Sequence, residues 1–212
     1  MSMFDIEWHW DVPYLETLTR QEYIRNRVHK GGSELILLAE HPPTITLGKR
    51  GGTIFQVPEG TTVQEINRGG LATWHGPGQL ALYPIIQLNR YKLGVRSLAC
   101  LLESATIDTL EHLGIQGTRR HNAPGIWVHD RKIAALGLDV KKGINIHGVA
   151  LNIHNDASCF SCIEACGDSS VSYTSVDQEL QISMSSLQTI GTLWIQSFIQ
   201  ALSGSSVNNS CN

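Results

Sequence analysis

The cysteines are the first residues of this 212-residue sequence whose type and spacing could do chemistry. Cys159, Cys162 and Cys166 fall within eight residues, and His154 shortly precedes them. C-x2-C is a common zinc half-site that His154 could help to complete, but the chain has no second C-x2-C pair. Alternatively, Cys166 is a nucleophile, because Gly167 and a polar turn follow it as a reactive thiolate requires. Metal binding, catalysis and a structural role therefore all remain open.

The second candidate is the glycine-rich run Arg68–Gln79, which holds four glycines and one proline in twelve residues. Glycines allow main-chain N–H groups to approach a ligand closely, while Arg68 and His75 offer charge and hydrogen bonds. The spacing matches neither the P-loop nor G-x-G-x-x-G, so a nucleotide cradle is not indicated. The run is either a binding loop or a double turn between strands.

Two further polar residues stand beside short apolar segments. Lys132 precedes the small residues of Ile133–Gly137, where partial desolvation would let it act as a base near neutral pH. The plainer alternative is a solvated lysine flanking a strand. His147 is followed by Gly148 and further small residues, but a single histidine is more often structural than catalytic.

Length and composition limit the classes of protein to be considered. The chain suits one substantial domain, since about 150–250 residues bury roughly 70% of their unfolded surface. With 42% hydrophobic and 17% charged residues it is too apolar for disorder. It has no apolar run of membrane-helix length, its first ten residues do not resemble a signal peptide, and its net charge of −3 does not suit a nucleic-acid binder. We therefore expect a cytoplasmic protein with reduced cysteines and with neither a membrane nor a nucleic-acid partner.

The elements that must position these residues follow from hydrophobic periodicity. Helices are expected over residues 13–30 and 97–113 and around Leu187, Ile190, Trp194 and Phe198. Pro84 lies in an apolar run that tolerates it only at a sheet edge or a bulge. Short strands are expected at Leu35–Ala39, Thr44–Leu47, Leu80–Leu88, Gly125–Val128, Ile133–Leu138 and Val149–Ile153.

The pattern as a whole predicts one α+β domain over residues 1–202, in which short strands mostly neighbour each other and three helices pack on them. Gly125–Ile153 is expected to form a meander of strands. Residues 203–212 contain only Ser, Asn, Gly, Val and Cys, and we expect them to be a disordered tail.

In their order, these segments resemble the lipoyl(octanoyl) transferase family, the octanoyltransferases of lipoate biosynthesis. The resemblance covers about residues 34–176. Trp74 stands where the family usually has Tyr, and Ala165 where it usually has Pro. The motifs that carry the resemblance are Glu40–Gly48, Arg68–Gln79 with Tyr83-Pro84, Gly125–Gly137, His147–Asn152 and Phe160–Ser175.

The resemblance implies the fold of the biotin and lipoate protein ligases, a mixed β-sheet packed with helices. It also implies transfer of an octanoyl group from octanoyl-acyl carrier protein to a lysine of lipoyl domains, in 2-oxoacid dehydrogenases and in the glycine cleavage carrier protein. Cys166 would form the acyl-thioester, and Lys132 would be the base that generates its thiolate and later takes the proton of the acceptor amine. No metal and no cofactor are implied, because a thioester is already activated, and we expect a monomer.

The octanoyl chain needs an apolar slot, whose walls we assign to three segments. A basic patch for an acidic carrier protein is expected at Arg119-Arg120-His121 or Lys141-Lys142, although these charges could equally be solvated turn residues. The slot residues are Arg68, Gly69, Gly70, Leu71, Ala72, Thr73, Trp74, His75, Ala135, Leu136, Gly137, Gly148, Val149 and Ala150.

Three rival functions remain. An ATP-dependent lipoate–protein ligase would share the fold but would not need Cys166. A non-catalytic metal- or cluster-binding protein would use Cys159, Cys162 and Cys166. A cysteine hydrolase would pair Cys166 with His147 or His75 and would release free fatty acid.

Overall fold

A computed structural model describes residues 3–121, 123–164, 171–182 and 186–204. Its main sheet runs in the order β1-β2-β6-β10-β9-β8-β7, with β11 paired to β9. A second, three-stranded sheet runs β4-β3-β5. The strands are β1 (Asp5–His9), β2 (Leu35–Ala39), β3 (Thr44–Leu47), β4 (Thr62–Glu65), β5 (Ala72–His75), β6 (Gln79–Ile85), β7 (Thr118–Arg119), β8 (Ile126–Val128), β9 (Arg131–Lys141), β10 (Ile144–Asn152) and β11 (Ser172–Tyr173).

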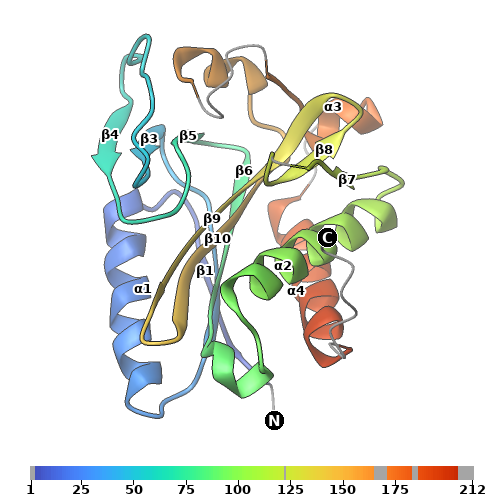
Figure 1. Ribbon diagram of the computed structural model, residues 1–212. Coiled ribbons are helices and arrows are strands. Elements are labelled where there is room, and N and C mark those ends of the chain that lie inside the picture. The colour runs from blue at the N-terminus through green and yellow to red at the C-terminus, as the bar shows by residue number, and fades with distance from the viewer. Residues whose placement is uncertain (1–2, 122, 165–170, 183–185, 205–212) are drawn as a thin grey trace.

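Helices cover both faces of the main sheet (Figure 1). The helix α1 lies on one side, and α2 and α4 pack together on the other. No helix in the described ranges is both long and apolar enough to span a membrane. The helices are α1 (Tyr14–His29), α2 (Val95–His112), α3 (Val176–Leu180) and α4 (Leu187–Ser203), with 3-10 turns at Leu88–Tyr91 and Ala157–Cys162.

The apolar run of β2 is buried on both faces because the sheet is covered on both sides. Leu35 and Leu37 pack with Ile24 of α1, whereas Ile36 and Leu38 join the core around Trp194 of α4. All five residues of β2 are fully buried. Strand alternation therefore assigns one set of side chains to each helical layer.

Most of the expected elements are observed. The helices at 13–30, 97–113 and 187–198 correspond to α1, α2 and α4, and β8, β9 and β10 form the expected antiparallel meander. The strands β1, β4, β5, β7 and β11 were not expected. The α+β class with a mixed sheet is confirmed, since β1 and β2 pair in parallel while β6, β10 and β9 are antiparallel.

The expectation that Pro84 lies at a sheet edge or a bulge is wrong, because β6 lies between β2 and β10. The ladder between β6 and β10 runs from Gln79 to Leu82 and resumes only at an isolated bridge at Gln87. In the interval, the Asn145 side chain donates a hydrogen bond to the carbonyl oxygen of Pro84, at 2.9 Å. A central strand thus tolerates a residue without an N–H where its ladder is interrupted.

Candidate active-site cavity

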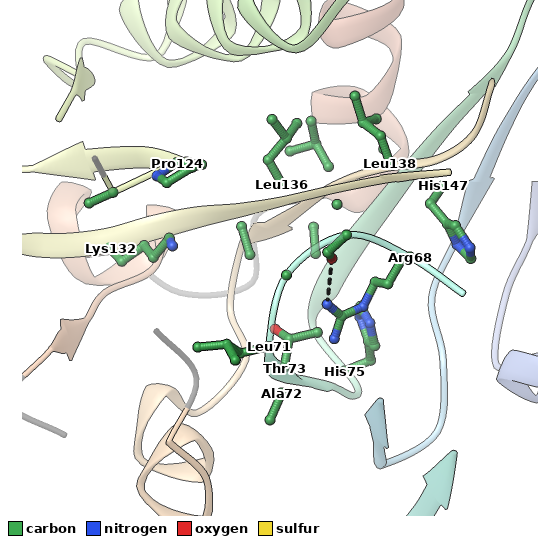
Figure 2. A pocket seen from close by; sticks show the side chains of 18 of the residues that line it. Arg68, Leu71, Ala72, Thr73, His75, Pro124, Lys132, Leu136, Leu138 and His147 are labelled. Atoms are coloured by element: carbon green, nitrogen blue, oxygen red, sulfur yellow. Dashed lines mark hydrogen bonds between the residues drawn. The ribbon is translucent and has the colours of Figure 1, made fainter. Parts of the chain in front are cut away.

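A cavity of about 740 Å³ lies between the glycine-rich run and the β9–β10 hairpin (Figure 2). This volume lies within the range of small-molecule sites. The described residues that line it include Arg50, Arg68, Arg120 and Lys132 but no aspartate or glutamate. Thirteen of the fourteen expected slot residues are part of its wall: Arg68, Gly69, Gly70, Leu71, Ala72, Thr73, His75, Ala135, Leu136, Gly137, Gly148, Val149 and Ala150.

Trp74 is the expected slot residue that does not line the cavity. Successive side chains of a strand point to opposite faces, so β5 directs Thr73 and His75 toward the cavity and Trp74 away from it. The Trp74 indole packs edge-on against Phe160, with ring centroids 5.9 Å apart. Phe160 in turn stacks on Tyr173 at 3.9 Å, and Tyr173 does line the cavity. Trp74 therefore supports the wall from behind.

Main-chain contacts hold the glycine-rich run against both sheets. The Gly69 N–H donates to the Leu138 carbonyl of β9 at 2.9 Å, and the Lys49 N–H donates to the Arg68 carbonyl at 2.9 Å. Gly48 is required here, since a Cβ atom would lie 2.5 Å from the Gly70 carbonyl oxygen. The run is thus a wall segment fixed by neighbouring backbone, with strand β5 inside it.

Two of the expected slot residues, Gly137 and Gly148, are small because neighbouring protein atoms lie directly beside them. A Cβ atom on Gly148 would lie 2.1 Å from the Leu82 carbonyl oxygen, so this glycine permits the approach of β10 to β6. A Cβ atom on Gly137 would lie 3.1 Å from Cδ of Arg68. Gly137 therefore leaves space for the Arg68 side chain, which packs against β9 at this position.

Lys132 lies on β9 at one end of the cavity and is only 5% exposed. Its Nζ lies 5.3 Å from the ring centroid of Trp127, and its carbonyl accepts a hydrogen bond from the Thr174 N–H at 3.0 Å. Gly125, with φ of +117°, leaves the space beside this side chain open. The alternative of a solvated lysine is thus wrong, because Lys132 is a buried amine within the cavity wall.

Cys166, the expected nucleophile, lies outside the described residues, as does Ala165. Val171 follows this segment and lines the cavity, as Tyr173 does. The pairing of Cys166 with Lys132 therefore stays a prediction.

At the end opposite Lys132, the cavity is lined by the polar side chains of Arg68, His75 and His147 (Figure 2). Tyr14 and Tyr83 also line the cavity, with ring centroids 5.2 Å from His75 and 6.4 Å from His147 respectively. The Tyr14 hydroxyl lies 3.3 Å from His147 Nδ1, although these residues are 133 positions apart in the chain. Burial, assisted by the nearby Arg68 charge, lowers the pKa of His147 to about 3. Burial, followed by the charges of His41 and Arg68, also holds the pKa of His75 well below its usual value. Both imidazoles are therefore neutral at physiological pH.

Tyr14, Tyr83 and His147 were not among the residues expected to line the slot. Tyr14 was interpreted only as part of a helix face, and nothing in its local sequence could have placed it in a cavity. Tyr83 and His147 belong to segments that carry the family resemblance, and that was the available signal for them.

The expected basic patches differ in their positions. Arg120 lines the cavity, with its guanidinium 4.4 Å from the Trp127 ring centroid, whereas Arg119 pairs with Glu103 at 3.1 Å. Lys141 forms an ion pair with Asp139 and does not line the cavity. Arg50, which was not expected, does line it. Of the expected patches, only Arg120 contributes a cation to the cavity, where it joins Arg50, Arg68 and Lys132, and Lys141-Lys142 contributes none.

Cys159 and Cys162 are free cysteines of the 3-10 turn Ala157–Cys162. Burial raises the pKa of both thiols, so neither is a reactive thiolate at neutral pH. Among the described residues, no group of three or more His, Cys, Asp or Glu side chains could hold a metal ion. Cys100 of α2 is disulfide-bonded, so the expectation that every cysteine is reduced is wrong at this position.

Comparison with known proteins defines the class of protein. The family model of the lipoyl protein ligase A/B catalytic domain matches residues 13–205. An octanoyltransferase from Desulfovibrio desulfuricans is 35% identical over 192 residues, which cover 87% of this chain and 81% of that protein. One from Marinobacter nauticus is 42% identical over 166 residues, which cover 77% of this chain and 78% of that protein.

Solved structures agree at the level of the fold. A putative lipoate protein ligase from T. acidophilum superposes with a TM-score of 0.70 at 17% identity, covering 94% of this chain and 85% of that one. A biotin protein ligase from Aquifex aeolicus gives 0.56 at 11% identity, covering 95% of this chain and 70% of that one. The fold and the cavity thus define a catalytic domain of the lipoyl protein ligase A/B type. Within this class, the chain belongs to the octanoyltransferase family and is an acyltransferase.

Proposed function

We propose that this enzyme transfers an octanoyl group from octanoyl-acyl carrier protein, through a thioester on Cys166, to a lysine of lipoyl domains. The observation that carries the proposal is the cavity, in which the buried amine of Lys132 lies at one end of an apolar wall. Leu71, Ala135 and Val149 are part of that wall. Burial of the seven carbons beyond the carbonyl would contribute on the order of 5 kcal/mol before the costs of binding.

The reaction consists of two acyl exchanges. In the first, Lys132 takes the proton of the Cys166 thiol and the thiolate adds to the thioester carbonyl. The carbon–sulfur bond to the carrier then breaks, and the leaving thiolate takes up the proton. In the second exchange, the acceptor amine attacks the acyl-cysteine, Lys132 receives its proton, and the Cys166 thiolate leaves. No ATP is consumed, because the donor thioester is already activated.

The proposed partners are supported by the charge of the cavity wall and by membership of the octanoyltransferase family. The cavity wall carries four cations and no carboxylate among the described residues, although the whole chain has a net charge of −3. Arg50 and Arg120 are exposed and would attract an acidic carrier protein. The acceptors would be lipoyl domains of 2-oxoacid dehydrogenases and the glycine cleavage carrier protein.

The decisive experiment is intact-mass spectrometry of the enzyme after incubation with octanoyl-acyl carrier protein and without ATP. We expect one octanoyl adduct, located on Cys166 by peptide mapping and transferred to a lipoyl domain when that is added. The Cys166→Ser variant should lose nearly all transfer, while Cys159→Ser, in the same part of the chain, should retain it. Transfer that needs ATP and survives Cys166→Ser would instead indicate a ligase. Release of octanoate without transfer would indicate a hydrolase.

A further inference from the structure

The segment between β7 and β8 forms part of the cavity wall at the end where Lys132 lies. Ala123 and Pro124 of this segment line the cavity, and Pro124 and Lys132 lie at the same end of it (Figure 2). Gly125, which directly precedes β8, lies beside the Lys132 side chain and leaves it space because it has no Cβ atom. The position of this segment therefore determines the room that the proposed base has.

Glu103 of α2 holds the segment at both of its ends. One carboxylate oxygen accepts a hydrogen bond from the Gly125 N–H at 3.1 Å, and the other accepts one from Arg119 Nε, also at 3.1 Å. Arg119 is the last residue of β7. Glu103 is not among the described residues that line the cavity, so it holds this part of the wall from outside.

Arg119 keeps the Glu103 carboxylate oriented. Its Nη2 donates hydrogen bonds to the Cys100 carbonyl at 3.0 Å and to Ser104 Oγ at 2.6 Å, and both acceptors belong to α2. The Glu103 side chain is only 13% exposed, and a hydrogen bond between two ionised groups is stronger than one between neutral groups. The oxygen that faces the Gly125 N–H is therefore fixed in direction.

We propose that Glu103 is a positioning residue for acyl transfer, which acts through Gly125 on the amine of Lys132. By holding the Gly125 N–H, it keeps this glycine against the Lys132 side chain and the amine in the cavity wall. The inference rests on the proposed function, in which Lys132 is the base. Proton transfer requires the base within hydrogen-bond reach, so a small displacement of the amine is enough to slow it.

This role depends on the reach of the acceptor at position 103 rather than on its charge. Glu103→Gln keeps an oxygen at the same reach but removes the charge, whereas Glu103→Asp keeps the charge but is one methylene shorter. At saturating donor, we expect Glu103→Gln to be acylated within threefold of the wild-type rate. We expect Glu103→Asp to be at least tenfold slower, because its carboxylate no longer reaches the Gly125 N–H.

The test follows acylation by intact-mass spectrometry with two donors, octanoyl-acyl carrier protein and octanoyl-N-acetylcysteamine, a small thioester without a carrier protein. Glu103→Asp should slow both donors by the same factor, because the base serves both. The donor concentration that gives half the maximal rate should stay within threefold of wild type. The fraction of enzyme finally acylated should equal that of wild type, which a loss of folded protein would reduce. Glu111→Asp, an exposed change on the same helix, should leave all of these values unchanged.

Three results would overturn the proposal. They are a wild-type rate in folded Glu103→Asp, a Glu103→Gln variant as slow as Glu103→Asp, and slowing confined to the carrier-bound donor, which would place the effect on docking. If Glu103→Asp does not fold, Glu103→Met takes its place with the same expected result, since it keeps the length but has no oxygen acceptor. If neither donor acylates the wild-type enzyme, the proposed function itself has failed, and this outcome is distinct from failure of the role of Glu103.

Discussion

The side chain of Lys132 occupies the space directly beside Gly125. A Cβ atom on that glycine would lie 2.6 Å from Lys132 Cε and 3.3 Å from its Nζ, with the Ala134 carbonyl oxygen at 2.4 Å. The Gly125 N–H is held by the Glu103 carboxylate of α2 at 3.1 Å. A glycine on a neighbouring segment thus fixes the path of the amine proposed as the base.

Substitution Gly125→Ala should displace this amine. The added methyl group has no room and the φ of +117° is unfavourable for alanine, so we expect acylation to slow at least tenfold. Intact-mass time courses measure this, with circular dichroism to verify folding. Gly94→Ala is the matched control, because a Cβ atom there meets nothing within 4 Å. A folded Gly125→Ala enzyme acylated at the wild-type rate would show that Lys132 does not act as proposed.

The apolar wall should set which chain lengths fit. Ala135 lines the cavity and is only partly buried, so Ala135→Leu would project new carbon atoms into the slot. We expect octanoyl transfer to fall at least tenfold and butanoyl transfer to change less than threefold. The measurement is acylation by a series of acyl-carrier thioesters, with Ala99→Leu on α2 as control. Equal effects on both lengths would count against an acyl chain at this wall.

The two described thiols of the cysteine cluster should be dispensable for chemistry. Burial raises the pKa of both Cys159 and Cys162, so neither is a good thiolate at neutral pH. The double variant Cys159→Ala/Cys162→Ala should keep octanoyl transfer within threefold of wild type, whereas Cys166→Ala should abolish it. Loss of transfer in a folded double variant would show that Cys159 or Cys162 is needed for the reaction.

Asp139 should be a determinant of stability rather than of catalysis. Its buried carboxylate accepts hydrogen bonds from Lys49 and Arg25, both at 2.8 Å. Burial alone would raise the pKa of Asp139, but these hydrogen bonds and the nearby cations lower it to about 2. Because the folded-state pKa is depressed, the stabilisation of about 2 kcal/mol is present above pH 4 and is lost as the pH falls toward 2.

Asp139→Asn should therefore lower the free energy of unfolding by about 2 kcal/mol at pH 7, since it removes the buried one of the two carboxylates that pair with Arg25, the other being the exposed Glu22 at 3.2 Å. Urea denaturation at pH 7 and pH 3 measures this. The difference between the two proteins should shrink at pH 3. A constant difference across this range would contradict the assigned role. Asp130→Asn, on an exposed turn, is the control.

Much of the secondary structure could be predicted because burial leaves a clear pattern in the sequence. The continuous apolar run of β2 and the helical spacing of Leu98, Leu101, Leu102 and Ala105 in α2 reflect elements with covered faces. The strand β4 could not be found this way, because three of its four residues are exposed. Pro84 was misplaced because the interrupted ladder beside it depends on β10, sixty residues later.

The walls of the cavity were predictable for a different reason. Glycines and small residues mark places where backbones approach closely, and the family resemblance indicated which of these face a substrate. The polar end was not predictable, because it combines Tyr14 from the first helix with His75 and His147 from distant strands. Trp74 was wrongly assigned to the slot, because its membership of a motif did not reveal which face of β5 its side chain occupies.

Strand β9 carries both the proposed base, Lys132, and the buried carboxylate of Asp139. Lys132 lies near its start and Asp139 near its end, and at about 3.3 Å per residue the seven steps between them span roughly 23 Å. Substitutions at Asp139 could consequently change the stability at low pH without altering proton transfer at Lys132. One end of β9 thus serves the proposed chemistry and the other end serves stability, and the residues at the two ends can change independently.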